Sequence, residues 1–82
     1  MMKPVPIKLE QIYVPAKLRA TLDPARVAAL AEAILAEGLQ SPIQVRRDGE
    51  RFVLVTGLHR LEACRSLGEK TIPALIVLPR VH

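Results

Sequence analysis

The 82 residues are enough for one small domain and too few for two, and half of them are apolar. A net charge of +4 comes from twelve Lys/Arg and eight Asp/Glu, without the run of like charges that marks a nucleic-acid-binding arm. The single cysteine excludes an intramolecular disulfide, and no apolar stretch resembles a signal peptide or membrane span. We therefore expect one domain over residues 1–82 that is cytoplasmic and binds no membrane.

The first half of the chain predicts a strand, a connector and a helix. Residues 7–14 alternate loosely between apolar and polar, which is typical of a strand, and residues 15–19 form a connector. Asp23 and Pro24 predict the start of a helix, because Asp caps free amides and Pro is tolerated in the first turn. Gly38 predicts its end. The apolar positions at helical spacing are Val27, Leu30, Ala31, Ile34 and Leu35.

The second half predicts a hairpin, a second helix and a last strand. Ile43–Arg46 alternates with Ile43 and Val45 inward, and Asp48-Gly49 joins it as a hairpin to the strand Arg51–Val55. Residues 71–78 are almost continuously apolar, as in a strand covered on both faces, with Pro73 at its start or beside a sheet edge. We expect an α+β fold with a small mixed sheet of about four strands and two main helices.

The strongest candidate site is the junction between the strand Arg51–Val55 and the helix that follows it. Gly57 ends the apolar run 52–55, and a helical pattern begins at once. The free amides of a helix N-terminus attract anions, and His59 and Arg60 add donors suited to a phosphate. The same residues also fit a plain turn followed by a solvated Arg60, so the pattern alone leaves both readings open.

Other chemistry finds little support in the residues. No His/Cys/Asp/Glu group has the spacing of a metal site, and neither a catalytic triad nor a Walker-type phosphate loop occurs. Cys64 falls with Leu61 and Leu67 on the apolar face of the second helix, which Gly68 closes. We expect Cys64 to be a core residue rather than a nucleophile.

Five motifs together resemble the ParB/sulfiredoxin superfamily over about residues 9–78 of the sequence. Similarity to ParB proteins lies in Pro15-x-x-x-Arg19, in residues 37–45 (EGLQSPIQV) and in residues 57–63 (GLHRLEA), where ParB proteins carry a nucleotide box. Similarity to sulfiredoxins lies in residues 22–27 (LDPARV), in residues 71–74 (TIPA), and in Gly57–Arg60, where sulfiredoxins have Gly-Cys-His-Arg.

This resemblance implies binding of a nucleoside triphosphate, CTP in ParB proteins and ATP in sulfiredoxins, with Mg²⁺ held through the phosphates. The phosphate contacts it implies are Gly57, Leu58, His59, Arg60, Arg26 and Arg19. Ala29 and Ala33 stand where sulfiredoxins use hydroxyl side chains, which puts the adenosine end of such a site in question.

Departures from both families limit the function. Leu58 replaces the sulfiredoxin nucleophile, so sulfinic acid repair is not expected. The free-serine kinases of the superfamily need an acidic base, for which Glu62 is the nearest candidate, although it reads more simply as a solvated helix residue. Without a recognition helix we expect no sequence-specific DNA binding by this chain alone. The alternative to nucleotide binding is an accessory DNA-partition or mobile-element module with a protein partner and a vestigial pocket.

Overall fold

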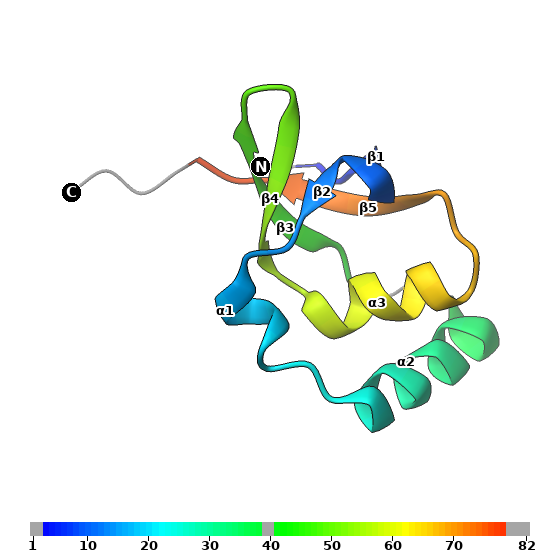
Figure 1. Cartoon of the computed structure of the whole chain (residues 1–82). Helices are drawn as coiled ribbons and strands as arrows, with labels where there is room; N and C mark the ends of the chain where they lie inside the picture. The colour runs from blue at the N-terminus through cyan, green and yellow to red at the C-terminus, as the bar shows by residue number, and fades with distance from the viewer. Residues whose placement is uncertain (1–2, 39–40, 79–82) are drawn as a thin grey trace.

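A mixed five-stranded sheet forms one layer of the structure, a computed structural model that describes residues 3–38 and 41–78 (Figure 1). In chain order the elements are β1 (Val5–Lys8), the 3₁₀ turn η1 (Leu9–Gln11), β2 (Ile12–Tyr13), α1 (Ala16–Arg19), α2 (Pro24–Glu37), β3 (Ile43–Asp48), β4 (Arg51–Thr56), α3 (Leu58–Ser66) and β5 (Thr71–Ile76). The predicted α+β class is confirmed, with five strands rather than about four and with the short helix α1 in addition to the two main helices. Residues 39–40, which belong to the motif at 37–45, lie outside the described residues.

The predicted first strand is in fact two strands on opposite edges of the sheet. The strand order is β1-β5-β3-β4-β2, with β1 antiparallel to β5 and β2 parallel to β4. Between them the chain turns at η1, where the Leu9 N–H donates to the Lys70 carbonyl. Ile7, Leu9, Ile12 and Val14 are all buried. The three-residue step from Leu9 to Ile12 breaks the period of two, and the prediction of one strand was wrong there.

The connector predicted at residues 15–19 is also more ordered than expected. Ala16–Arg19 form α1, which Pro15 precedes as its N-cap. The Pro15 carbonyl accepts from the N–H of both Leu18 and Arg19, and so closes the single turn. Proline is well tolerated at a helix start, since it has no N–H to satisfy. The turn therefore follows directly from the proline that ends the preceding extended segment.

The central strands of the sheet are paired as the sequence predicted. β3 and β4 are antiparallel through Asp48↔Arg51, with Gly49 at a φ of +62° in the turn. Ile43 and Val45 point into the core and are 1% and 0% exposed. Pro73 lies opposite Pro6 on the edge strand β1 and comes before the register of β5 with β3, which begins at Ile43↔Ala74, so its missing N–H interrupts no pairing with β3.

Only one face of the sheet is covered by helices, which corrects the prediction for the last strand. In β5 the side chains of Ile72 and Ala74 are buried, whereas Thr71 and Pro73 are exposed. On the open face, Val53 lies between its cross-strand neighbours Tyr13 and Arg46. The prediction that the strand at 71–78 is covered on both faces was therefore wrong.

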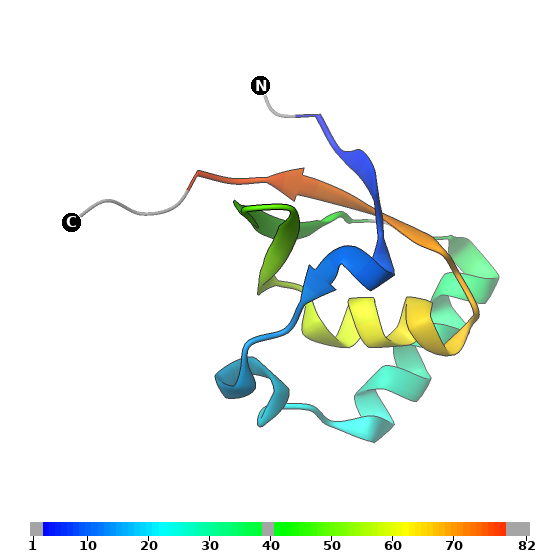
Figure 2. The ribbon, with the colours of Figure 1, turned by 45° about the horizontal axis from the view of Figure 1, so that its top comes forward.

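Helix α3 lies between the sheet and α2, as the two ribbon views show (Figures 1 and 2). Its residues Leu58, Leu61 and Cys64 belong to the core cluster beneath the sheet, and Ala63 is also fully buried. Helix α2 packs on α3 and has no fully buried residue. Its predicted apolar stripe holds for the half-buried Val27, Leu30, Ala31 and Ile34. Leu35 is 75% exposed, so its assignment to the stripe was wrong.

Candidate functional site

The turn from β4 into α3 has a conformation that only glycine can adopt at low cost. Gly57 is the N-cap of α3 with φ 110° and ψ 30°, in the left-handed region. A Cβ atom there would lie 2.6 Å from Cγ2 of Ile43, closer than any real contact. The turn that the sequence predicted is therefore present, and it brings the start of α3 directly against the first residue of β3.

The N-terminus of α3 leaves its first amides without partners. The helical hydrogen bonds begin where the Leu61 N–H donates to the Gly57 carbonyl, at 2.9 Å. No side chain caps this end, and no acceptor among the described residues meets the N–H of Leu58, His59 or Arg60. Free amides and the positive end of the helix dipole make such a terminus suitable for an anion.

The N-terminus of the neighbouring helix α2 is, by contrast, already satisfied. The Asp23 carboxylate accepts from the Ala25 N–H at 3.1 Å, and Pro24 has no N–H to satisfy. The Arg26 N–H donates to the Asp23 carbonyl. Of these two helix starts, only that of α3 offers backbone N–H donors without an acceptor among the described residues.

His59 connects the two helix starts. Its Nε2 accepts a hydrogen bond from the backbone N–H of Asp23, at 3.0 Å. A ring nitrogen that accepts carries no hydrogen, so the imidazole is neutral with its proton on Nδ1. While this bond is intact, His59 can donate to a ligand only through Nδ1–H. Its first role in the structure is to hold α2 against α3.

Arg60 and Arg26, two of the predicted phosphate contacts, lie in different surroundings. Arg60 is half-buried and Arg26 is exposed on the first turn of α2, and neither side chain has an ion pair or hydrogen bond with any described residue. Burial raises the pKa of the Cys64 thiol, and Glu69 raises it further, while the positive charge of Arg60 lowers it. Arg60 comes four residues before Cys64 and so lies on the same side of α3.

A cavity of about 390 Å³ opens beside the start of α3, between α1, β2 and α3. Apolar side chains and Tyr13 form part of its wall, and three charged side chains complete it. The lining residues are Ile12, Tyr13, Val14, Arg19, Leu22, Leu58, Glu62 and Arg65. This volume is within the usual range for small-molecule sites. We call it the α1–α3 cavity.

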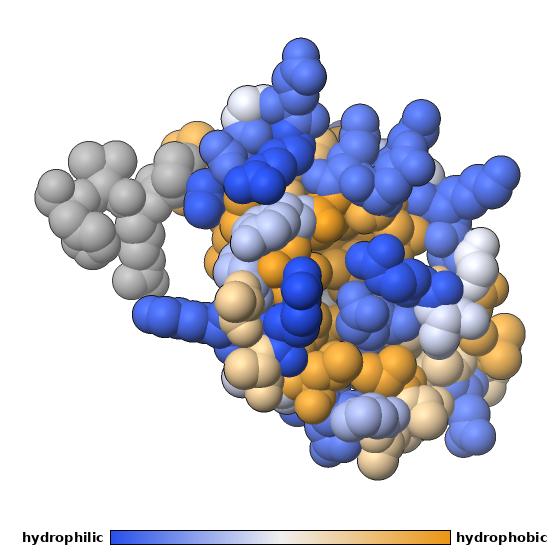
Figure 3. Space-filling view, in the orientation of Figure 1, coloured by the Kyte–Doolittle hydropathy of each residue, from blue (hydrophilic) through white to orange (hydrophobic). Residues whose placement is uncertain are grey.

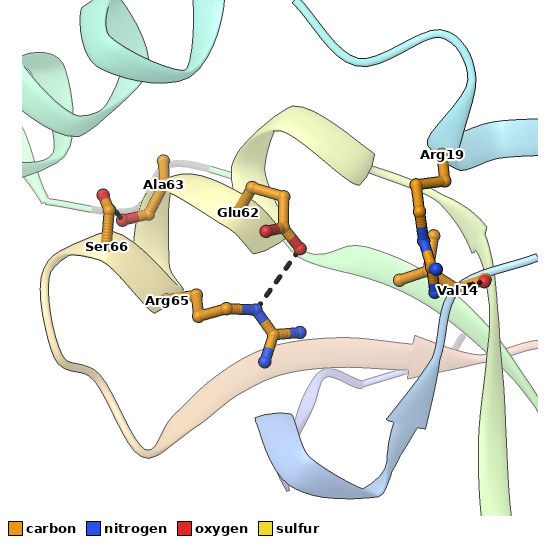
Figure 4. Close-up of polar contacts among 6 residues, drawn as sticks. All are labelled: Val14, Arg19, Glu62, Ala63, Arg65 and Ser66. Atoms are coloured by element: carbon orange, nitrogen blue, oxygen red, sulfur yellow. Dashed lines mark hydrogen bonds and ion pairs between the residues drawn. The ribbon is translucent and has the colours of Figure 1, made fainter. Parts of the chain in front are cut away.

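Two of the six predicted site residues line this cavity. The Arg19 side chain reaches from α1 and donates from Nη2 to the Val14 carbonyl at 3.4 Å (Figure 4). The side chain of Leu58 is apolar and only 6% exposed, so the residue can offer a ligand no donor except its backbone N–H. At about 100° per residue, Arg60 lies about 200° around α3 from Glu62, away from the cavity wall. Arg19 and Arg60 therefore approach the start of α3 from different sides.

Glu62 and Arg65 were not predicted as site residues. The Arg65 Nε lies 3.3 Å from Oε2 of Glu62, one turn along the helix (Figure 4). The Glu62 side chain is 27% exposed and so is far less solvated than the sequence suggested. Both residues also line a smaller hollow of about 280 Å³ between α2 and α3. Opposite charges three residues apart were visible in the sequence, but such pairs are common on helix surfaces.

The space-filling view shows apolar surface exposed between hydrophilic side chains on the face drawn in Figure 3. Within residues 3–38 and 41–78, no group of three or more His, Cys, Asp or Glu side chains could hold a metal ion. None of the helices within these residues could span a membrane.

Comparison with known proteins gives the same fold and one family. The sequence matches the ParB N-terminal domain over residues 3–80. It is 34% identical over 58 residues to the chromosome-partitioning protein ParB of Myxococcus xanthus, a match that covers 71% of this chain and 20% of the relative. The chain thus spans about a fifth of the length of that curated relative.

Two solved structures show how closely the architecture is shared. Sulfiredoxin from Arabidopsis thaliana aligns with a TM-score of 0.78 and 31% identity, over 95% of this chain and 85% of that one. The C-terminally truncated ParB of Caulobacter crescentus, complexed with CTP-gamma-S, aligns with a TM-score of 0.77 and 23% identity, over 96% of this chain and 45% of that one. At that identity the second likeness concerns the fold alone.

Proposed function

The chain belongs to the ParB N-terminal domain family, and from this premise we propose that it binds a nucleoside triphosphate at the N-terminus of α3. The phosphates accept hydrogen bonds from the free amides of Leu58, His59 and Arg60. The Arg60 guanidinium and the Nδ1–H of His59 add donors, and Gly57 allows the close approach. Arg26 supplies long-range positive charge from the first turn of α2.

The observation that carries this proposal is the contrast between the two helix starts. At α2 the Asp23 carboxylate occupies the place that an anion would take, whereas the α3 start has no capping side chain. A helix start without a capping side chain leaves its first N–H groups to water or to a ligand. A phosphate at α3 would supply the missing acceptors.

The α1–α3 cavity is the space available to the rest of the nucleotide. It adjoins Leu58, the first residue of α3, and its apolar wall suits the faces of a base. Arg19 lies on its α1 side, where a guanidinium can meet the ribose or a phosphate. In this arrangement Arg19 and Arg60 approach the ligand from two sides of the helix start.

CTP and ATP are the two candidate ligands. A ParB relative with the same fold has been solved with CTP-gamma-S, which supports CTP, and the resemblance of Gly57–Arg60 to the sulfiredoxin motif supports ATP. Because no acidic cluster among the described residues could hold a metal, Mg²⁺ would enter through the phosphates and water. The proposal includes a cytoplasmic location, where such nucleotides are available.

One observation favours the alternative, an accessory partition or mobile-element module that works through a protein partner. The Glu62 carboxylate stands in the α1–α3 cavity and opposes the charge of a triphosphate. The lining of the cavity carries Arg19 and Arg65 against Glu62, a net charge of only +1 from these groups. If nucleotide affinity is absent, this reading replaces the first.

Calorimetric titration separates the two functions. We expect wild-type protein to bind ATP or CTP with Mg²⁺ saturably, with ADP and GTP completing the panel. Arg60→Ala should weaken binding by about 1.5–3 kcal/mol, typical of a charge-assisted hydrogen bond, or roughly ten- to hundredfold. Arg47→Ala, which removes the same charge at the far hairpin, is the control. Absence of binding at millimolar nucleotide, or an unchanged affinity in Arg60→Ala, refutes the phosphate site.

A further inference from the structure

The wall of the α1–α3 cavity contains a hydrogen-bonding pair that phosphate binding does not use. Glu62 and Arg65 lie on successive turns of α3 and meet through Oε2 and Nε. This contact engages one carboxylate oxygen and one guanidinium nitrogen. Neither side chain has another hydrogen bond or ion pair with a described residue, so Oε1 of Glu62 and both Nη atoms of Arg65 remain available. The pair therefore presents a free acceptor beside free donors.

We propose that Glu62 selects the base of the bound nucleotide and that the site prefers bases with an exocyclic amino group. This inference rests on the proposed function, because it assumes that the phosphates lie at the start of α3. Glu62 is four residues beyond Leu58, or about 6 Å along the helix axis. A base in the apolar part of the cavity therefore meets Glu62 with an edge rather than with its phosphates.

The preference follows from what a carboxylate can accept. Cytosine, adenine and guanine carry an amino group that projects from the ring and donates, and a carboxylate is a recognised partner for the cytosine amino group. Uracil and hypoxanthine place a carbonyl oxygen at the position of the amino group of cytosine and adenine, and an ionised carboxylate repels that oxygen. The ring N–H of uracil is recessed between two carbonyls, so it offers Glu62 no equivalent contact. A site whose partly buried acceptor faces the base disfavours a ligand that cannot donate to it.

Arg65 supports this selection without replacing it. Its Nε–H donates to Oε2 of Glu62, which fixes the orientation of the carboxylate. Its free Nη–H groups can donate to the ring nitrogen next to the amino group of cytosine or adenine. The pair would then read two adjacent atoms of one base edge.

A simpler role for Glu62 makes a different prediction. If the carboxylate only repels phosphates, removing its charge strengthens every triphosphate by the same factor, whatever the base. If it reads the base, removing its charge changes the ratios between bases. The ratio of two affinities within one variant separates these roles, because general effects on charge or folding cancel in it.

The experiment titrates wild type and Glu62→Gln with two matched pairs, CTP with UTP and ATP with ITP, each pair differing in an amino group against a carbonyl. We expect wild type to prefer the amino member of each pair by about tenfold, and Glu62→Gln to reduce both ratios below about threefold, since an amide can donate to a carbonyl. Glu32→Gln, on exposed α2 outside the cavities described, should leave the ratios unchanged. Melting temperatures confirm that each variant is folded.

Each outcome decides the matter. Wild-type ratios near one, a preference for UTP or ITP, or a Glu62→Gln effect equal for all four nucleotides overturns the role of Glu62 while leaving phosphate binding at α3 intact. Failure of all four nucleotides to bind wild type overturns the proposed function and this inference together. Ratios that collapse only in Glu62→Gln support the selection.

Discussion

The backbone N–H of Asp23 donates to Nε2 of His59 across the interface between α2 and α3, at 3.0 Å. These residues are 36 positions apart in the chain. The bond joins the residue before α2 to the second residue of α3, and so places the two helix starts side by side. Because α2 has no fully buried residue, this polar contact contributes a larger share of its attachment than it would in a helix with a buried face.

His59→Ala should therefore loosen α2 more than it destabilises the whole protein. The lost hydrogen bond is exposed, so water can replace it, and we expect a cost of about 0.5–1.5 kcal/mol in the free energy of unfolding. Hydrogen exchange should accelerate in α2 and remain slow in β3 and β4. His59→Gln, whose side-chain oxygen can still accept, is the control. Equal exchange rates in α2 for wild type and His59→Ala would show that His59 does not hold α2 against α3.

Gly57→Ala should be strongly destabilising for two separable reasons. Alanine at φ 110° is strained, which costs about 1–3 kcal/mol, and its Cβ collides with Ile43. Gly49→Ala, also at a positive φ but with open space around it, should lose stability through backbone strain alone. Chemical denaturation should show a larger loss at Gly57 than at Gly49. Ile43→Ala should recover part of the difference in a double-mutant cycle, and purely additive effects would argue against the contact.

Leu58→Cys should not create a sulfinic acid reductase. The wild type lacks the nucleophile that the resemblance requires at this position, and the Leu58 side chain is 6% exposed, so a thiol in its place would be buried and poorly reactive. We expect neither protein to repair a hyperoxidised peroxiredoxin with ATP, as followed by mass spectrometry of the peroxiredoxin. Repair by Leu58→Cys would show that position 58 is more accessible than its burial indicates, and repair by the wild type would show that no nucleophile is needed at this position.

Cys64 should make stability fall at alkaline pH. Burial, aided by Glu69, raises the pKa of its thiol above the ordinary value despite the opposing charge of Arg60. The folded state then holds the proton more tightly than the unfolded state, so the stabilisation is complete below the ordinary thiol pKa of about 8.5 and is lost as pH rises through the folded-state pKa. Cys64→Ala should remove this loss of stability above the ordinary thiol pKa of about 8.5, as followed by urea denaturation at increasing pH. An identical pH slope in both proteins would contradict it.

DNA binding by this chain should be weak, sensitive to salt and indifferent to sequence. Its positive charges are scattered over the sequence, and contacts to phosphates carry no sequence information. Fluorescence anisotropy with two unrelated duplexes should give equal affinities that fall steeply as salt is raised. A footprint at physiological salt, competed by its own site and not by random duplex, would be incompatible with this expectation.

Local chemistry in the sequence determined most of the elements and the position of the candidate site. Asp23, Pro24 and Gly38 set the bounds of α2, since capping, a fixed φ and a left-handed C-cap act within a few residues. Asp48-Gly49 set the hairpin for the same reason, and Gly57 marked the start of α3. Alternation correctly assigned Ile43 and Val45 to the core.

Only the tertiary structure decided features that depend on distant residues. The separation of residues 7–14 into β1 and β2 follows from pairing with β5 and β4, and no local pattern contains those partners. The exposure of Leu35 and the open face of β5 reflect which surfaces the helices cover. Glu62 became a wall of the α1–α3 cavity because α1 and β2 fold against α3. His59 became the partner of Asp23 because α2 packs on α3, and side chains that can serve either a ligand or the fold are assigned by what lies within hydrogen-bond distance.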